Sequence, residues 1–356
     1  MNRIDAFLEL AVNQGGSDLH MVSGQPPRIR ISGDLQPIRF RELTVQDVQD
    51  FLLEFMDADD RRVLDLNESV DFAYESEKAG RFRVNVYKHV GGIAAAMRVI
   101  PTTIPSLDSI GLPPVVEQLL SVGKGLTLVT GPTGSGKSTT LAAMIDFLNR
   151  TTRGHIITIE DPIEFVHDYK QCVVTQREVG TDAPSFAEAL RSAVREDPDA
   201  ILVGEMRDLE TISLALTAAE TGIQVFGTLH TNGAVRCVDR IVNVFPPRKQ
   251  EQVRTMLSGA LRLVVAQQLV RKADHSGRLV AAEVLINTHA VSSMIRTGNA
   301  NKLSSAIQAG SRIGMQGLDT VLSEMVRNEQ ITGEEAYEHA IDRGNFERFL
   351  SQGEAA

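Results

Sequence analysis

The sequence predicts an α/β protein in which a small mixed domain precedes a larger domain built on a wound parallel sheet. Three observations lead to this prediction. After residue 115, short apolar runs alternate with stretches of helical spacing, as in a parallel sheet whose strands are connected by helices. A proline-punctuated segment, residues 101–114, separates this part from a shorter region with strand-like alternation. Apolar residues make up 42% of the chain, which is a typical globular value.

The first hundred residues predict a small mixed α/β domain that begins with a helix. Apolar residues recur with helical spacing over residues 4–14. A short strand is expected over residues 28–31. A second helix is expected over residues 44–56, because Thr44 can serve as its N-cap and Asp47 stands three residues later as the capping partner.

Two further strands, residues 81–87 and 93–100, carry arginines. Arg83 alternates with apolar neighbours, so it should lie on the polar face of its strand. Arg98 stands inside an apolar run. Because an arginine is costly to bury without a partner, we expect Arg98 to contact a negatively charged group.

The second domain, expected over residues 115–356, alternates strands and helices. The expected central strands cover residues 126–130, 156–159, 200–203 and 225–229. The expected helices between them cover residues 140–148, 185–196 and 209–220. From residue 245 the chain is expected to be mostly helical, with an apolar-periodic run over residues 250–270, a strand over 279–286 and short helices from about residue 287.

One stretch between the first of these strands and the first helix predicts phosphate binding. It consists of Gly131, Pro132, Thr133, Gly134, Ser135, Gly136, Lys137, Ser138 and Thr139. The glycines allow backbone N–H groups to turn toward a phosphate, and the helix that starts near Lys137 adds unpaired N–H groups. Lys137 can reach the β- and γ-phosphates, and the Ser138 hydroxyl can bind Mg²⁺. We therefore predict a site for ATP with Mg²⁺.

Polar clusters follow three of the expected strands, where an open α/β sheet binds its ligands. Glu164 and Glu205 are candidates for holding Mg²⁺ or orienting the attacking water, and Asp161 competes with Glu164 for that role. His230 could donate a hydrogen bond to the γ-phosphate. Each residue type is also common on an ordinary surface, so convergence of the clusters at the phosphate loop is what would indicate function.

Phosphoryl transfer also needs positive charge near the γ-phosphate. Arg191 and Arg195 share one face of an expected helix, and pairing with acids such as Glu188 is the structural alternative. Arg83 and Arg98 lie in the first domain, outside the sheet that bears the phosphate loop. Either could act as an arginine finger, including on the site of a neighbouring subunit.

Composition limits the remaining classes of function. The formal net charge is −10, which disfavours non-specific nucleic-acid binding. No apolar run reaches the length of a bilayer span and the first residues show no signal-peptide pattern, so a cytoplasmic protein is expected. Two cysteines are too few for a disulfide framework or a four-thiolate zinc site.

Four segments together resemble the secretion and type IV pilus motor ATPases, and among them the pilus retraction ATPases of the PilT family. They are residues 131–139 (Walker A), 158–165 (aspartate box), 202–208 (Walker B) and 227–232 (histidine box). Residues 16–20 and 81–85 match the same family. The resemblance covers nearly the whole chain.

This resemblance implies a PAS-like N-terminal α/β domain (1–100), a linker (101–114) and a RecA-like P-loop ATPase domain with C-terminal helices (115–356). It implies a homo-hexameric, Mg²⁺-dependent ATPase motor that powers pilus retraction from the cytoplasmic face of the inner membrane. The implied partners are a membrane platform protein and a paralogous retraction ATPase, with no nucleic acid. The implied catalytic residues are Glu205, Glu164, His230, Arg83 and Arg98, with Arg191 and Arg195 as further candidates; Ser138, Glu164 and Glu205 are the implied metal ligands.

Several alternatives stay open at this stage. The absence of a long N-terminal extension and of a four-cysteine motif favours retraction over a pilus assembly or type II secretion ATPase. Retraction ATPases typically carry Ala-Ile-Arg-Asn-Leu-Ile-Arg-Glu near the C-terminus, whereas residues 290–297 read Ala-Val-Ser-Ser-Met-Ile-Arg-Thr. An accessory retraction paralogue is therefore an alternative. A nucleic-acid translocase and a nucleotide sensor without turnover are the rivals from other classes.

Overall fold

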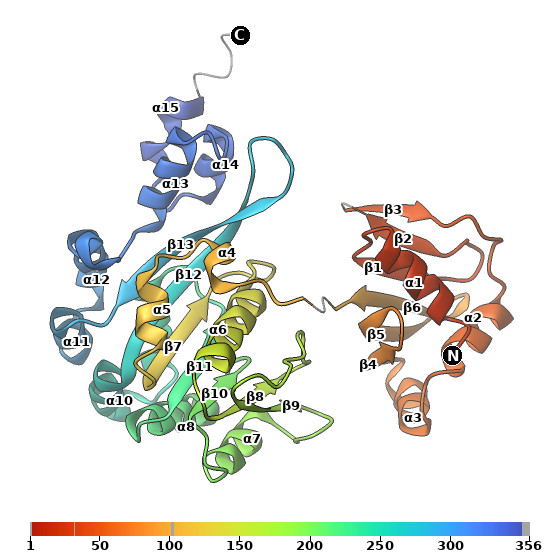
Figure 1. Ribbon diagram of the computed structural model, residues 1–356, viewed down its shortest axis with the longest axis horizontal. Helices are drawn as coiled ribbons and strands as arrows, with labels where there is room; N and C mark the ends of the chain where they lie inside the picture. The colour runs from red at the N-terminus through yellow and green to blue at the C-terminus, as the bar shows by residue number, and fades with distance from the viewer. Residues whose placement is uncertain (1, 32, 101–102, 351–356) are drawn as a thin grey trace. The chain divides into compact units, whose positions relative to one another are not determined.

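The computed structural model describes residues 2–31, 33–100 and 103–350, which form two compact units, Met1–Thr103 and Ile104–Ala356 (Figure 1). Each unit combines helices with one sheet, so the predicted α/β fold class is confirmed. Residues 101–102 of the expected linker and residues 351–356 lie outside the described residues. Among the described residues, no helix combines the length and the apolar character needed to cross a membrane.

The N-terminal unit is built on a six-stranded antiparallel sheet with the order β3-β2-β1-β6-β5-β4. Its strands are β1 (Asp18–Met21), β2 (Arg28–Ile31), β3 (Asp34–Pro37), β4 (Ser69–Ser76), β5 (Gly80–His89) and β6 (Gly92–Val99). Its helices are α1 (Asp5–Asn13), α2 (Val45–Leu53) and α3 (Ala58–Asn67). The predicted capping box of α2 is confirmed: Thr44 accepts from the backbone of Asp47 and Asp47 accepts from that of Thr44.

The alternation along β5 separates this sheet into two faces. Phe82, Val84 and Val86 are buried in the core cluster that also holds residues of α1 and α2. Arg83 and Arg98 face the other way, with 44% and 68% of their side chains exposed. The expected negative partner of Arg98 is Asp18, to which its Nε donates at 3.0 Å.

The second unit is built on a seven-stranded sheet with the order β13-β12-β7-β11-β10-β8-β9, parallel except for β13. Its strands are β7 (Gly125–Thr130), β8 (His155–Glu160), β9 (Val173–Glu178), β10 (Ala200–Val203), β11 (Gln224–Leu229), β12 (Leu261–Arg271) and β13 (Arg278–Ile286). The helices are α4 (Leu107–Ile110), α5 (Val115–Leu120), α6 (Lys137–Thr151), α7 (Phe186–Ala193), α8 (Leu209–Glu220), α9 (Ala234–Asn243) and α10 (Pro247–Ala260).

One sequence expectation was wrong in this unit. The apolar run over residues 250–270 divides into the end of α10 and the strand β12. Residues 263–266 are buried, as in a parallel strand covered on both faces, and periodicity cannot distinguish such a run from a buried helix. The correction matters because β12 pairs with β7, the strand that leads into the phosphate loop.

Helices after β13 complete the unit. They are α11 (His289–Arg296), α12 (Leu303–Ala309), α13 (Leu318–Arg327), α14 (Gly333–His339) and α15 (Glu347–Leu350), with three short 3₁₀ turns at Ala300–Lys302, Ser311–Ile313 and Arg343–Asn345. Helices α13 to α15 gather at one end of the β12–β13 pair (Figure 1). Leu318 and Leu322 of α13 pack there with Val270 in a separate apolar cluster.

Candidate functional site

The phosphate loop connects β7 to α6, as the sequence predicted. Gly136 is the N-cap of α6 with φ = 84° and no side chain caps the helix, so its first N–H groups remain available to an anion. Gly131 has φ = 149°, and a Cβ there would lie 2.2 Å from the backbone oxygen of Gln267. The loop therefore requires glycine where it passes closest to the neighbouring strand.

Lys137 lies inside this loop with its side chain buried. Its Nζ donates to the carbonyl oxygens of Gly131 and Pro132, both at 3.0 Å. Burial lowers the pKa of Lys137, while the nearby carboxylates of Glu205 and Glu164 act to raise it. The structure thus brings both predicted carboxylates within electrostatic reach of the predicted lysine.

Hydrogen bonds connect the polar segments that follow the strands. Gly204 N donates to Ile159 O at 2.7 Å, and Met206 N donates to Thr228 O at 3.1 Å. At the end of β7, Thr130 Oγ1 accepts from the backbone N–H of Thr231 at 3.1 Å. These bonds hold the segments after β8, β10 and β11 along the same edge of the sheet as the phosphate loop.

Glu205 is the centre of a small charged group. His230 Nε2 lies 3.2 Å from Glu205 Oε1, and Arg207 forms an ion pair with the same oxygen. Burial acts to raise the pKa of Glu205, but Arg207 and His230 outweigh it and lower the pKa overall. Glu205 is therefore ionised at neutral pH. Sequence reasoning did not select Arg207, although it follows Glu205 by two positions in the Walker B segment.

Glu160 supports the segment that carries Glu164. Its carboxylate accepts from Thr158 Oγ1 at 2.7 Å, from Gln176 Nε2 at 3.3 Å and from the backbone of Glu164. Burial raises the pKa of Glu160 to about 7, against the hydrogen bonds, which act to lower it. The exposed carboxylate of Asp161 acts to raise the pKa of Arg207, whereas the carboxylate of Glu164 acts to raise the pKa of Lys137. This difference favours Glu164 over Asp161 as the carboxylate at the phosphate loop.

The residues present fit a divalent cation. Ser138 lies in the first turn of α6. The carboxylates of Glu164 and Glu205 both act to raise the pKa of Lys137, the residue before Ser138, so they lie near the start of this helix. A hydroxyl and carboxylate oxygens are the hard donors that Mg²⁺ prefers.

The predicted arginines differ in their surroundings. Arg191 is paired with Glu188, as the structural alternative expected, and also with Glu210. Arg195 is exposed, and its neighbour Glu196 pairs instead with Arg177 at 2.9 Å. Among the described residues, neither arginine forms an ion pair with the phosphate loop.

Arg98 and Arg83 belong to a cross-strand row in the N-terminal unit. The register pairs Arg30 with Asp18, Asp18 with Arg98, and Arg98 with Arg83. Asp18 accepts from Arg98 Nε and lies 3.9 Å from Arg30 Nε, while Arg83 Nε lies 3.6 Å from Asp71. Burial acts to raise the pKa of Asp18, but bonds from Ser17 and Arg98 lower it overall. In this row Asp18 holds Arg98 by its Nε, while the side chains of Arg83 and Arg98 stay 44% and 68% exposed.

Comparisons with known proteins agree with this site. A sequence profile of the family described as Type II/IV secretion system protein matches residues 1–347. The chain belongs to this family. The type IV pilus retraction ATPase PilT of Pseudomonas aeruginosa is 48% identical to it over 96% of this chain and 99% of that protein. A twitching motility protein of Neisseria gonorrhoeae is 48% identical over 88% of this chain and 84% of its own length.

Solved structures include a close match from the same secretion family. A crystal structure of the pilus retraction motor PilT with bound ADP superposes with a TM-score of 0.91 at 45% identity, covering 98% of this chain and 99% of that one. Together these similarities confirm the predicted enzyme class, an ATPase, and the predicted binding of a nucleotide.

Proposed function

We propose that this chain is the ATPase motor of type IV pilus retraction. The observation that carries the proposal is the convergence of Glu164, Glu205 and His230 with Lys137 at one edge of the parallel sheet. The direction of the motor rests on its relatives, because the retraction ATPase PilT matches nearly end to end.

The residues of the second unit can perform ATP hydrolysis as follows. Lys137 exchanges the carbonyl oxygens of Gly131 and Pro132 for phosphate oxygens, and the open N-terminus of α6 binds the same phosphates. Glu205, ionised at neutral pH, orients the attacking water and accepts its proton, with His230 beside it. Mg²⁺, held by Ser138 with Glu205 and Glu164, would neutralise charge on the terminal phosphates.

The arginine row supplies the remaining positive charge in this proposal. Asp18 accepts from the Nε of Arg98, and 68% of the arginine side chain stays exposed, so a positive charge remains accessible to an anion. We propose that Arg98, with Arg83, stabilises the γ-phosphate of a neighbouring subunit as an arginine finger. Arg191 and Arg195 remain weaker candidates for the same role.

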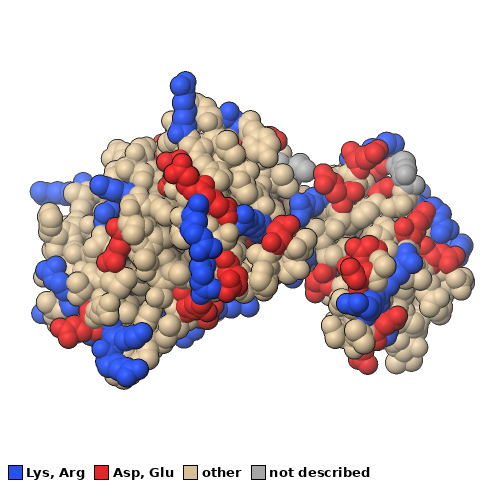
Figure 2. Space-filling model, turned by 90° about the horizontal axis from the view of Figure 1, so that it is seen from below, with Lys and Arg blue, Asp and Glu red and all other residues tan. Residues whose placement is uncertain are grey.

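The family resemblance supports the proposed assembly and its surroundings. The motor is a homo-hexamer that works at the cytoplasmic face of the inner membrane on a platform protein, with a paralogous retraction ATPase as a further partner. Differences between the ATP- and ADP-bound contacts would rotate the two units relative to each other in each subunit. On the face drawn in Figure 2, described acidic and basic side chains are interspersed, which gives no support to a nucleic-acid translocase.

Two experiments test this proposal. Steady-state hydrolysis of ATP should fall to background in Lys137→Ala, and turnover like that of the wild type would remove the site assignment. Deleting the gene in its own host should abolish twitching and leave excess surface pili. Loss of all surface pili would instead indicate an assembly motor.

An accessory retraction paralogue is the second candidate. The observation that favours it is α11, where residues 290–297 keep only part of the retraction-type segment. A deletion strain that keeps measurable twitching would support this candidate over the main motor.

A further inference from the structure

We infer that Gln267 is a positioning residue of the phosphate-binding loop, acting from the adjacent strand β12. The inference rests on the proposed ATPase function, because it concerns how the same loop is held in its binding conformation. Gln267 lies one residue after Ala266, which pairs with Thr130 at the end of β7. Its side chain is 1% exposed, so it is fully enclosed beneath the loop.

The side chain of Gln267 holds one peptide group of the loop. Its Nε2 donates to the backbone carbonyl oxygen of Ser135 at 2.7 Å. A carbonyl oxygen can only accept, so the amide nitrogen must be the atom that faces it. A planar trans peptide directs its C=O and N–H in opposite directions. Fixing the Ser135 carbonyl toward Gln267 therefore directs the Gly136 N–H away from Gln267, toward the other side of the loop.

Gln267 also lies close to two glycines of the loop, through its backbone at Gly131 and through its side chain at Gly136. A Cβ on Gly131 would lie 2.2 Å from the Gln267 carbonyl oxygen, and a Cβ on Gly136 would lie 3.3 Å from Gln267 Nε2. The same residue thus touches the beginning and the end of the loop. A pocket lined by Gly131, Gln267 and Leu318 of α13 adjoins this contact.

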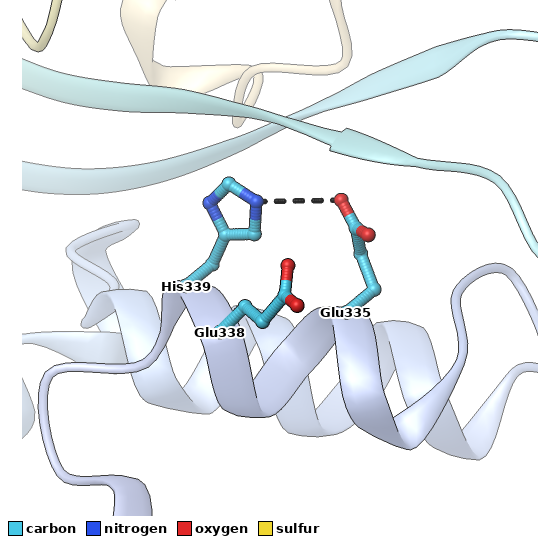
Figure 3. A group of neighbouring side chains, drawn as sticks. All are labelled: Glu335, Glu338 and His339. Atoms are coloured by element: carbon cyan, nitrogen blue, oxygen red, sulfur yellow. Dashed lines mark ion pairs between the residues drawn. The ribbon is translucent and has the colours of Figure 1, made fainter.

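The next residue provides a matched control. Gln268 Oε1 lies 2.7 Å from His339 Nδ1. His339 Nε2 in turn lies 3.3 Å from Oε1 of Glu335, one turn earlier on α14 (Figure 3). Glu335 also accepts from the backbone N–H of Arg271 at 2.7 Å. These bonds account for Glu335 and His339, so we assign no metal to the group they form with the exposed Glu338. Gln268 thus binds the C-terminal helices, whereas Gln267 binds the phosphate loop.

The test compares Gln267→Met with Gln268→Met in the full-length protein. Methionine keeps the length of glutamine and removes the donor, leaving the Ser135 carbonyl buried without its partner. We expect the Kd for ADP and the KM for ATP to rise about tenfold in Gln267→Met, the scale of one lost buried hydrogen bond. Turnover at saturating ATP should change much less, and the melting temperature should fall in both methionine variants, because each loses a hydrogen bond that is present without nucleotide. In Gln268→Met, both nucleotide constants should stay within about twofold of the wild type.

A second variant keeps the inference testable if Gln267→Met fails to fold. Gln267→Glu retains the shape, but its carboxylate cannot donate until it is protonated, which burial favours at lower pH. Its ADP affinity relative to the wild type should therefore recover as the pH falls from about 8 to 6. Wild-type nucleotide constants in Gln267→Met, equal losses in both methionine variants, or a pH-independent ratio for Gln267→Glu would overturn the inference. A wild-type protein that binds ADP without hydrolysing ATP would contradict the proposed function and leave this inference standing.

Discussion

The two sheets of this protein place their proposed catalytic residues in different ways. In the parallel sheet, every residue of β7, β10 and β11 is buried and uncharged, so the charged side chains near these three strands follow their ends. In the antiparallel sheet, β5 has one apolar and one polar face, Arg83 projects from within β5, and Arg98 projects from the last residue but one of β6. A parallel sheet covered on both faces presents an edge to its ligand, whereas a half-covered antiparallel sheet can present a whole face.

The largest expected effect removes the functional face of the antiparallel sheet. The double variant Arg83→Ala/Arg98→Ala should lower kcat by ~10³–10⁵, the range of an arginine finger. ADP affinity should change little, because the phosphate loop is intact. Steady-state hydrolysis and ADP titration measure the two effects, with Arg62→Ala, an exposed arginine of α3, as the control. Full turnover in the double variant would show that the edge of the parallel sheet suffices alone.

The next effect removes the carboxylate at the edge of the parallel sheet. Glu205→Gln keeps the shape of the side chain but cannot accept a proton, so kcat should fall by ~10²–10⁴. Glu220→Gln removes an exposed carboxylate from the far end of α8 and should leave kcat unchanged. Single-turnover hydrolysis separates chemistry from product release. Equal turnover in the two variants would contradict the role of Glu205.

A smaller effect should come from the residue that holds Arg98. Asp18→Asn removes the carboxylate that accepts from Arg98 Nε, and kcat should fall about fivefold, on the scale of one largely exposed ion pair of ~1 kcal/mol. Because the pKa of Asp18 is lowered in the folded protein, its contribution to stability is present at neutral pH and is lost as the pH falls through that pKa. If Asp18→Asn matches the wild type in kcat, the row does not position Arg98.

The last effect concerns stability and leaves turnover unchanged. The pKa of Glu160 is raised to about 7 in the folded protein, so between pH 4.5 and 7 the folded state binds more protons than the unfolded state. Its contribution to stability is thus complete at low pH and is lost as the pH rises toward 7. Glu160→Gln should flatten this loss, by on the order of 1–3 kcal/mol between pH 5 and 7.5. Melting temperatures recorded across that range test it, and parallel curves for the two proteins would count against it.

The same contrast between the two sheets explains which residues could be predicted from the sequence. Strand-end clusters stand out because polar residues interrupt apolar runs, so Glu164, Glu205 and His230 could be selected in advance. The alternation of polar and apolar residues along β5 likewise predicted that Arg83 lies on the polar face of its strand. The apolar residues around Arg98 in the sequence predicted a negatively charged partner, which is Asp18.

Other features could not be predicted for physical reasons. The run that contains β12 is apolar on both faces and continues from a helix, so its pattern does not distinguish strand from helix. Gln267 consequently fell within a predicted helix, and its contact with Ser135 depends on the pairing of two strands distant in the sequence. Arg207 was missed because an exposed arginine beside a carboxylate is common on any surface.

One measurement tests most directly the claim that Glu205 of one subunit and the arginines Arg83 and Arg98 of a neighbouring subunit act on the same phosphate. Glu205→Gln and Arg83→Ala/Arg98→Ala, each nearly inactive alone, are mixed under conditions in which subunits exchange, and ATP hydrolysis is followed against the mixing ratio. If the arginines of one subunit serve the phosphate loop of its neighbour, some sites in the mixture carry both intact sets, and hydrolysis should rise to a maximum near equal amounts. Hydrolysis that stays at the level of the separate variants at every ratio, with mixed assemblies demonstrated, would contradict the account.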